Sequence, residues 1–138
     1  MFDRIKMWLQ TPPGPARILL AEDDAVLRSV IEATLREDGH EVVPFPDGNH
    51  LLAHIEELVM VENSTPPDLI ISDLMMPGYT GIEILSAIRQ ADFDTPVILI
   101  TAYGDRAAHE MAFELGAAMI DKPFGVNVLL DTVRCLVR

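Results

Sequence analysis

Residues 69–78 read LIISDLMMPG, and the position of Asp73 within this stretch decides how the whole chain is interpreted. The residues just before it are almost wholly apolar, which is typical of a short strand buried on both faces of a parallel sheet. Pro77 and Gly78 follow closely and indicate a turn. A carboxylate therefore stands where a buried strand ends, and the rest of the sequence must explain why.

Short apolar runs of the same kind recur along the chain, separated by segments in which apolar residues recur every three or four positions. The runs predict strands and the periodic segments predict helices. The predicted strands are RILLA (17–21), EVVPF (41–45), DLIIS (68–72), PVILI (96–100) and AAMI (117–120), and the predicted helices lie at 24–37, around 51–59, from about Gly81, at 105–115 and at 126–137. This alternation predicts an α/β fold with one doubly wound, five-stranded parallel sheet covered on both faces.

Single residues refine this prediction. Pro44 cannot donate a sheet hydrogen bond, so its strand is predicted to lie at the edge of the sheet. In the fourth helix, Ala108, Met111 and Leu115 are predicted to face the core, and Gly116 is predicted to end the helix. Cys135, the only cysteine, cannot form an internal disulfide and is predicted to be a buried thiol.

Composition excludes several classes of protein. A length of 138 residues suits one domain, and 22 acidic against 10 basic residues give a net charge of −12. This balance argues against a nucleic-acid surface and favours a basic partner or a cation. No apolar run approaches the ~18 residues of a membrane span, and no signal-peptide core is evident at the N-terminus. We therefore expect a cytoplasmic protein that does not enter a membrane.

Residues 1–16 differ from the rest and are predicted to form an N-terminal extension with a Pro-rich linker, ahead of a domain at 17–138. The stretch MFDRIKMWLQ places Phe2, Ile5, Trp8 and Leu9 at helical spacing, and TPPGP then ends any helix. Two interpretations stay open: a frayed tail, or a short amphipathic helix that docks on the domain or on a partner.

Polar residues follow four of the predicted strands. They are Glu22, Asp23 and Asp24 after the first, Asp73 after the third, Thr101 after the fourth and Lys122 after the fifth. In doubly wound sheets ligands bind beyond the carboxyl ends of the strands, so these residues are predicted to meet at one edge. Crowded carboxylates need a cation, and oxygen ligands suit Mg²⁺. A hydroxyl and an ammonium can also receive phosphoryl oxygens, so Asp73 is predicted to be a nucleophile or a metal ligand.

Each of these residues has a plain structural alternative when it is considered alone. Asp24 is more simply explained as the N-cap of the first helix, because aspartate is a preferred residue there. Thr101 could be an ordinary strand-end residue and Lys122 a surface charge. Their joint occurrence at successive strand ends is the reason for preferring a functional site.

The motifs ILLAEDDAVLR, DLIISDLMMPGYTG, PVILITAY and GAAMIDKPF resemble, in this order, those of response-regulator receiver domains of two-component signalling. The resemblance covers residues 17–138 and implies the flavodoxin-like (βα)5 receiver fold with strand order 2-1-3-4-5. Because no output domain follows in the sequence, it implies a single-domain receiver of the CheY type. Such a domain is a signalling module and not an enzyme with a separate substrate.

The resemblance also implies a phosphoryl-transfer mechanism. Asp73 would accept a phosphoryl group from a phosphohistidine on a sensor histidine kinase or a histidine phosphotransfer protein. Lys122 would neutralise one phosphoryl oxygen, and Thr101 would hydrogen-bond another. Phosphorylation would then change how the face formed by the fourth helix, fifth strand and fifth helix binds a downstream protein or a second copy of the chain. No direct contact with nucleic acid or membrane is expected.

A Mg²⁺ cofactor is implied as well. By motif alignment, Asp23, Asp73 and the backbone carbonyl of Met75 would bind the ion, and Glu22 would act through water. A haloacid-dehalogenase-type phosphohydrolase would also use an aspartate after an apolar strand, but it needs a second aspartate where this chain has Met75.

Three residues depart from the usual receiver pattern. Met119 stands three positions before Lys122, where receivers usually have an aromatic residue. Met75 is apolar where many receivers are polar, and Tyr103 follows Thr101 closely. Our hypothesis is that Met75 and Tyr103 crowd the attacking water and make the phosphorylated form long-lived. The alternative function is a degenerate receiver that acts as an unphosphorylated docking module.

Overall fold

Five apolar strands pair side by side in a computed structural model of the chain, which describes residues 15–91, 93–102 and 106–137. The strands are all parallel and lie in the order β2-β1-β3-β4-β5, which confirms the predicted sheet and its strand order. Their bounds are β1 (Arg17–Ala21), β2 (Glu41–Phe45), β3 (Leu69–Asp73), β4 (Val97–Thr101) and β5 (Ala118–Asp121). The last three extend one residue beyond the predicted apolar runs, because the polar residue at each strand end still pairs with its neighbour.

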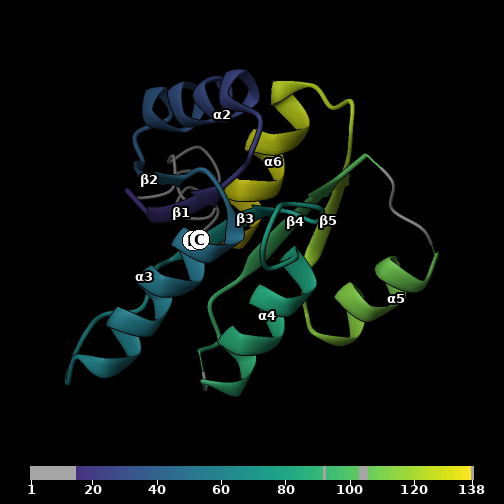
Figure 1. Ribbon diagram of the computed structural model, residues 1–138. Helices are drawn as coiled ribbons and strands as arrows, with labels where there is room; N and C mark the ends of the chain where they lie inside the picture. The colour runs from purple at the N-terminus through teal and green to yellow at the C-terminus, as the bar shows by residue number, and fades with distance from the viewer. Residues whose placement is uncertain (1–14, 92, 103–105, 138) are drawn as a thin grey trace, which may run out of the picture.

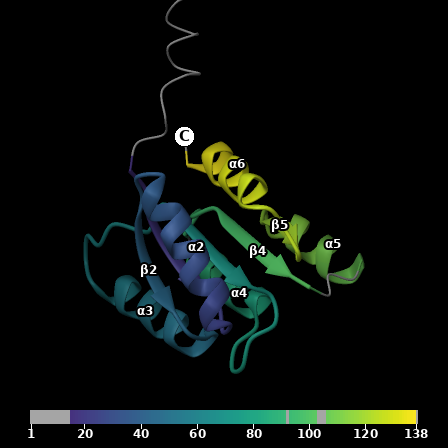
Figure 2. The same cartoon turned by 90° about the horizontal axis from the view of Figure 1, so that it is seen from above.

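Helices cover both faces of this sheet (Figure 1). They are α2 (Ala25–Glu37), α3 (Gly48–Met60), α4 (Gly81–Gln90), α5 (Arg106–Glu114) and α6 (Val126–Leu136). One core cluster joins α2 and α6 to Ile18 and Leu20 of β1, and the other joins α3, α4 and α5 to Leu19. Seen from above, α2 and α6 lie on the same side of the sheet (Figure 2). Side chains of successive residues in β1 thus point to opposite faces of the sheet and pack in different core clusters, as expected for a sheet buried on both faces.

Local sequence signals account for several element ends. Strand β2, which contains Pro44, is an edge strand as predicted. The Asp24 side chain accepts hydrogen bonds from the N–H groups of Val26 and Leu27, which confirms it as the N-cap of α2. Gly116 has a φ of +76°, so it ends α5 in the left-handed conformation that glycine tolerates.

Two burial predictions were wrong. In α5 the fully buried residue is Ala112, whereas Met111 is 48% exposed. Ala108, Ala112 and Leu115 form the inward stripe, and the larger Met111 lies beside it on the helix. Cys135 is exposed, because it lies two residues beyond the buried Val133 and therefore faces the opposite side of α6.

Some predictions fall outside the described residues. These are the interpretations of residues 1–14 and the suggested role of Tyr103. Within the described part of the chain, no helix is both long enough and apolar enough to cross a membrane.

Candidate functional site

The predicted site residues meet at the carboxyl edge of the sheet. The register pairs Ala21 with Ser72 and Asp73 with Ile100, so the ends of β1, β3 and β4 lie next to one another. Thr101 pairs with Asp121, which brings the end of β5 to the same edge. The parallel pairing thus places residues from four distant parts of the chain together, as the strand-end argument predicted.

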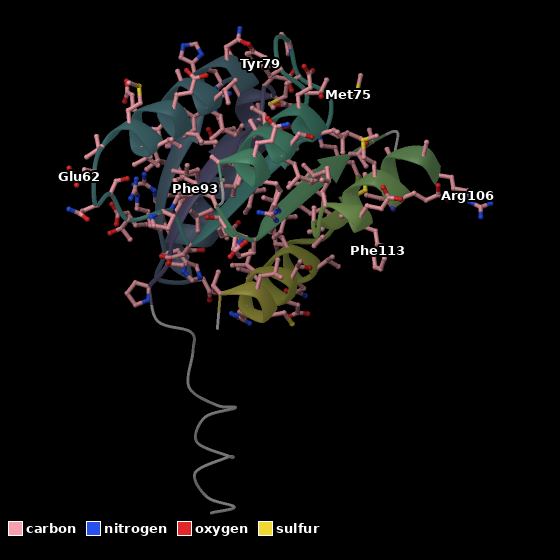
Figure 3. All side chains as sticks on the ribbon, turned by 90° about the horizontal axis from the view of Figure 1, so that it is seen from below. Glu62, Met75, Tyr79, Phe93, Arg106 and Phe113 are labelled. Carbon is pink, nitrogen blue, oxygen red and sulfur yellow. The ribbon has the colours of Figure 1, made fainter. Side chains whose placement is uncertain are left out.

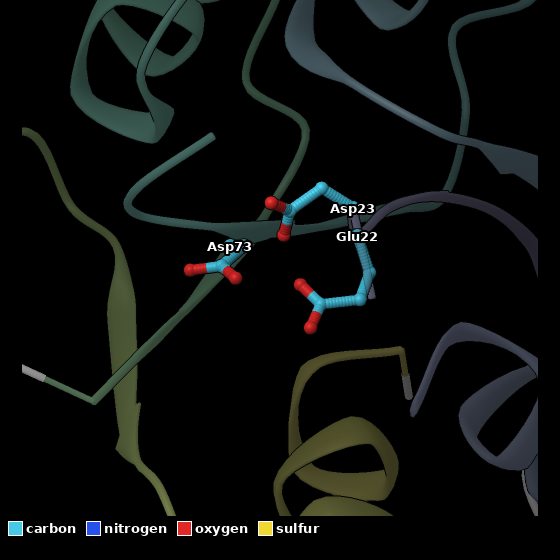
Figure 4. A group of neighbouring side chains, drawn as sticks. All are labelled: Glu22, Asp23 and Asp73. Atoms are coloured by element: carbon cyan, nitrogen blue, oxygen red, sulfur yellow. The ribbon is translucent and has the colours of Figure 1, made fainter. Parts of the chain in front are cut away.

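Three carboxylates gather at this edge (Figure 4). Glu22, Asp23 and Asp73 each place a carboxylate oxygen within 4.8 Å of the others. Glu22 and Asp73 are only 1% and 5% exposed, whereas Asp23 faces solvent. The cluster is therefore buried on its inner side and open on its outer side.

Lys122 compensates the buried negative charge. Its Nζ donates hydrogen bonds to Asp73 Oδ2 at 2.9 Å and to Glu22 Oε1 at 3.0 Å. Its backbone N–H donates to the carbonyl of Thr101 at 2.7 Å, which fixes the base of the side chain. Burial disfavours the charged ammonium, but the hydrogen bonds to Asp73 and Glu22 outweigh this effect and raise the pKa of Lys122.

Glu22 is the most deeply buried of the three carboxylates. Burial, followed by the proximity of Asp73, raises the pKa of Glu22 to about 8, against the opposing effect of Lys122. Its buried Oε2 accepts no hydrogen bond from any described residue. A buried acceptor of this kind is costly unless water or an ion satisfies it. The unsatisfied oxygen and the all-oxygen donor set fit a hard divalent cation such as Mg²⁺.

Asp73 is held at both of its side-chain oxygens. Met75 donates its backbone N–H to Oδ1 at 3.1 Å, and Lys122 binds Oδ2. The Met75 side chain is 61% exposed and lies on the loop that follows β3. This loop is attached to the sheet because Leu74 donates its N–H to the carbonyl of Ile100 and accepts a bond from the N–H of Gly81.

Two glycines let the backbone behind Asp73 pack closely, and the sequence analysis missed both. A Cβ atom on Gly48 would overlap the carbonyl oxygen of Tyr79, and a Cβ on Gly81 would lie 2.8 Å from the carbonyl oxygen of Asp73. The N-terminus of α3 therefore supports the loop that carries Met75. No sequence signal distinguishes this close tertiary contact from an ordinary glycine at a helix start.

The remaining predicted residues lie around the cluster. Thr101 is fully buried at the adjacent strand end. Asp24 caps α2 and does not belong to the acid cluster. Met119 is half-buried and packs against the core shared by α3, α4 and α5.

An apolar depression of about 480 Å³ adjoins Lys122 on the side of α2. Val26 and Val30 of α2 line it and are 75% and 47% exposed. Pro123 and Phe124, which follow Lys122, line the other side. A partner that packs in this depression would therefore lie directly beside the lysine.

The fold and the acidic strand-end site together define a flavodoxin-like α/β domain of the receiver class. The chain belongs to the family of response regulator receiver domains, whose family model matches residues 18–134. This confirms the resemblance carried by the four motifs. Receiver domains are signalling domains of two-component systems.

Individual relatives agree with this assignment. The chain is 35% identical over 122 residues to the response regulator RR06 of Streptococcus pneumoniae, covering 88% of the chain and 52% of the relative. It is also 35% identical over 123 residues to the DNA-binding response regulator MtrA of Mycobacterium tuberculosis, covering 88% and 50%. The chain thus spans about half the length of these relatives.

Solved structures show the same fold. The chemotaxis protein CheY4 of Vibrio cholerae aligns with a TM-score of 0.76 and 29% identity, over 89% of this chain and 99% of that protein. The receiver domain of the Francisella response regulator 1452 aligns with a TM-score of 0.76 and 28% identity, over 88% and 96%.

Proposed function

We propose that the chain is a phosphoacceptor receiver of a two-component or phosphorelay system, with Asp73 as the residue that is phosphorylated. The observation that supports this most directly is the setting of the Asp73 carboxylate. It is 5% exposed, bound by Met75 and Lys122 at its two oxygens, and next to two further acids. A carboxylate fixed in this way is oriented for attack on a phosphoryl group.

The proposed reaction moves the phosphoryl group from nitrogen to oxygen. An Asp73 oxygen attacks the phosphorus of a phosphohistidine, the P–N bond breaks, and an acyl phosphate forms while the donor's imidazole leaves. Lys122 then moves its ammonium from the carboxylate to a phosphoryl oxygen, and Thr101 donates its hydroxyl hydrogen to another. The geometry of the cluster supports these roles because Lys122 already lies 2.9 Å from Asp73.

The acid cluster fits the implied metal. Asp23, Asp73 and the Met75 carbonyl are the proposed Mg²⁺ ligands, with Glu22 acting through water. When bound, Mg²⁺ would neutralise the charge that three carboxylates and an incoming phosphoryl group bring to one place. The unsatisfied Oε2 of Glu22 and the raised pKa of this residue support the presence of a cation here.

The phosphodonor is proposed to dock on the apolar depression beside Lys122. Val26 and Val30 are exposed there on α2, so an apolar helix of a histidine kinase or phosphotransfer protein can bury them. This position would bring a donor histidine to the open side of the acid cluster. With a net charge of −12, the chain itself is proposed to act through proteins and not through direct contact with nucleic acid.

Phosphorylation with acetyl phosphate and Mg²⁺ tests this proposal. The native chain is expected to gain one phosphoryl group by mass spectrometry, and Asp73→Asn is expected to gain none. Asp24→Asn is the matched control, because asparagine also caps helices and Asp24 is not part of the cluster. Equal phosphorylation of the native chain and Asp73→Asn would overturn the assignment of the phosphorylated residue.

The degenerate, unphosphorylated receiver remains the second candidate, since Met119 occupies the position where receivers usually carry an aromatic residue. Binding of Mg²⁺ and beryllofluoride separates the two functions. A phosphoacceptor is expected to bind beryllofluoride only when Mg²⁺ is present, whereas a docking module is expected to bind neither.

A further inference from the structure

An apolar groove lies between α3 and α4, far from the acid cluster. Its volume is about 340 Å³, and its walls include Val59 and Met60 of α3 and the small residues Ala87 and Ala91 of α4. Val59 and Met60 are 48% and 85% exposed, and the adjoining Val61 is 60% exposed. Exposed apolar side chains around a groove are typical of a surface on which another segment docks.

The rim of this groove is acidic. Glu56 lines it, and Glu62 is exposed on the loop that follows α3. None of the ion pairs formed between described residues involves these two glutamates. The groove therefore suits an occupant that is apolar on one side and carries basic residues.

Residues 1–10 of this chain have that chemistry. Their sequence, MFDRIKMWLQ, combines the apolar residues Phe2, Ile5 and Trp8 at helical spacing with the basic residues Arg4 and Lys6. A helix with this pattern would present an apolar face to the groove and its basic residues to the acidic rim.

The chain enters the domain near the end of this groove. Arg17 donates its backbone N–H to Asp68 at 2.8 Å and a guanidinium N–H to the carbonyl of Thr65 at 3.4 Å. Thr65 lies only a short loop after Met60, where α3 ends. Glu62, on this loop, lies at the opposite end of α3 from Tyr79 (Figure 3). A Pro-rich linker over residues 11–15 reaches ~15 Å, which is sufficient to return to this end of α3.

The length of this linker also disfavours two other depressions on the described part of the chain. The one beside Lys122 lies at the opposite edge of the sheet, and β1 alone is five residues, or ~17 Å, long. The one on α5, lined by His109 and Phe113, belongs to a helix that packs on β5, the edge strand farthest from β2 and separated from β1 by two strands.

We propose that residues 1–10 bind the groove between α3 and α4 of the same chain, with Phe2, Ile5 and Trp8 against Val59 and Met60. The Pro-rich linker holds the segment at an effective concentration on the order of millimolar, so a modest intrinsic affinity suffices. The segment would shield the apolar groove and use the acidic rim to fix its orientation.

Trp8, the only tryptophan in the chain, provides a direct test. In the full-length protein its fluorescence is expected at shorter wavelength, and with less quenching by acrylamide, than in a peptide of residues 1–12. The double variant Val59→Gln, Met60→Gln is expected to move both values to those of the peptide. Phe113→Gln is the matched control, since it removes an 83% exposed apolar side chain from α5 and should leave Trp8 unchanged.

Two further arms identify the occupant. Arg4→Gln with Lys6→Gln is expected to weaken the shift of the Trp8 emission, and added salt should do the same in the native chain. Emission identical in the full chain and the peptide would overturn the proposal, as would a shift that survives the groove substitutions. A shift that disappears on dilution, together with a dimer by light scattering, would assign the groove to a second copy instead.

Discussion

Asp73 is constrained by neighbours from two different loops, and this explains why its carboxylate is tolerated in a buried place. The N–H of Met75 and the ammonium of Lys122 each satisfy one oxygen. Glu22 is less well satisfied, because Lys122 reaches only its Oε1. Lys122 therefore offsets only part of the buried negative charge, and Glu22 remains a buried acid whose ionisation a cation would favour.

Because the Glu22 carboxylate is incompletely hydrogen-bonded, we predict that the stabilisation of the protein by Mg²⁺ depends on pH. Glu22 has a folded pKa of about 8 against an ordinary value of 4.5, so between these values the folded state binds more protons than the unfolded state. Stability measured with a chelator is expected to fall as pH rises through this interval. The stabilisation given by Mg²⁺ is expected to rise over the same interval. The measurement is the thermal midpoint against pH, with EDTA and with Mg²⁺.

Glu22→Gln provides the control for this prediction, since glutamine keeps the size of the side chain without its proton equilibrium. The variant is expected to lose the pH dependence between about 4.5 and 8. Lys122 does not interfere, because its pKa is raised from 10.5 and its contribution is lost only above this window. An unchanged pH profile in Glu22→Gln would show that another group is responsible.

Met75 is predicted to slow the loss of the phosphoryl group. Its side chain is exposed on the loop next to Asp73, where it can occupy the space through which water approaches. Met75→Asn is expected to speed dephosphorylation several-fold, because a polar side chain can orient the attacking water. The decay of the phosphorylated chain measures this rate. Met75→Leu should retain the slow rate, and equal rates in all three proteins would contradict the hypothesis.

Most residues of the acid cluster could be predicted from sequence, and the reason is geometric. Glu22, Asp23, Asp73 and Lys122 each follow a recognisable apolar run, and parallel strands bring such positions to one edge. Gly48 could not be predicted, because its importance depends on a contact with Tyr79 that exists only after folding.

At the scale of elements, helix α3 supports the loop after β3 through this glycine contact. Gly48→Ala would force the Tyr79 carbonyl and its loop to move, since the added Cβ overlaps backbone. We expect weaker Mg²⁺ binding and a loss of ~1–3 kcal/mol in stability, the usual cost of overpacking. Calorimetric titration with Mg²⁺ and urea unfolding in EDTA measure the two effects separately.

Gly125→Ala is the matched control for Gly48→Ala, because a Cβ there meets no atom within 4 Å. It is the N-cap of α6, where alanine is less favourable than glycine, so a loss of stability of up to ~1 kcal/mol is expected with no change in Mg²⁺ affinity. Loss of stability in Gly48→Ala without any change in Mg²⁺ affinity would show that α3 does not position the metal-binding loop.

Helix periodicity predicted where elements lie better than which residues they bury. In α5 the prediction placed Met111 on the stripe that faces the core, but the helix approaches the sheet through the small Ala112. Small residues permit close packing and carry almost no hydrophobic signal, so such a contact cannot be recognised from a stripe of large residues.

At the scale of the whole molecule, the carboxyl ends and the amino ends of the strands carry different kinds of polar contact. The carboxyl edge carries the acid cluster, whereas the opposite edge is joined by a polar chain of contacts. Arg134 of α6 donates to Asp38 at 2.7 and 3.2 Å, and Asp38 lies 3.7 Å from His40. His40 Nδ1 in turn accepts the N–H of Ala16 at 3.1 Å. This chain ties α6 and the end of α2 to the point where the polypeptide enters β1.

Arg134→Gln is predicted to reduce stability and leave the acid cluster intact, because it acts only at this opposite edge. The hydrogen bond from Arg134 lowers the pKa of Asp38 below its ordinary 3.8, so the pair contributes above that value and its contribution is lost as pH falls through the lowered pKa. The difference in urea midpoint between Arg134→Gln and the native chain should therefore be present at neutral pH and vanish in strong acid. Mg²⁺ affinity should not change. If Arg134→Gln weakened Mg²⁺ binding as much as Gly48→Ala, this prediction would be wrong. The Arg134–Asp38 contact and the acid cluster would then be coupled through the sheet.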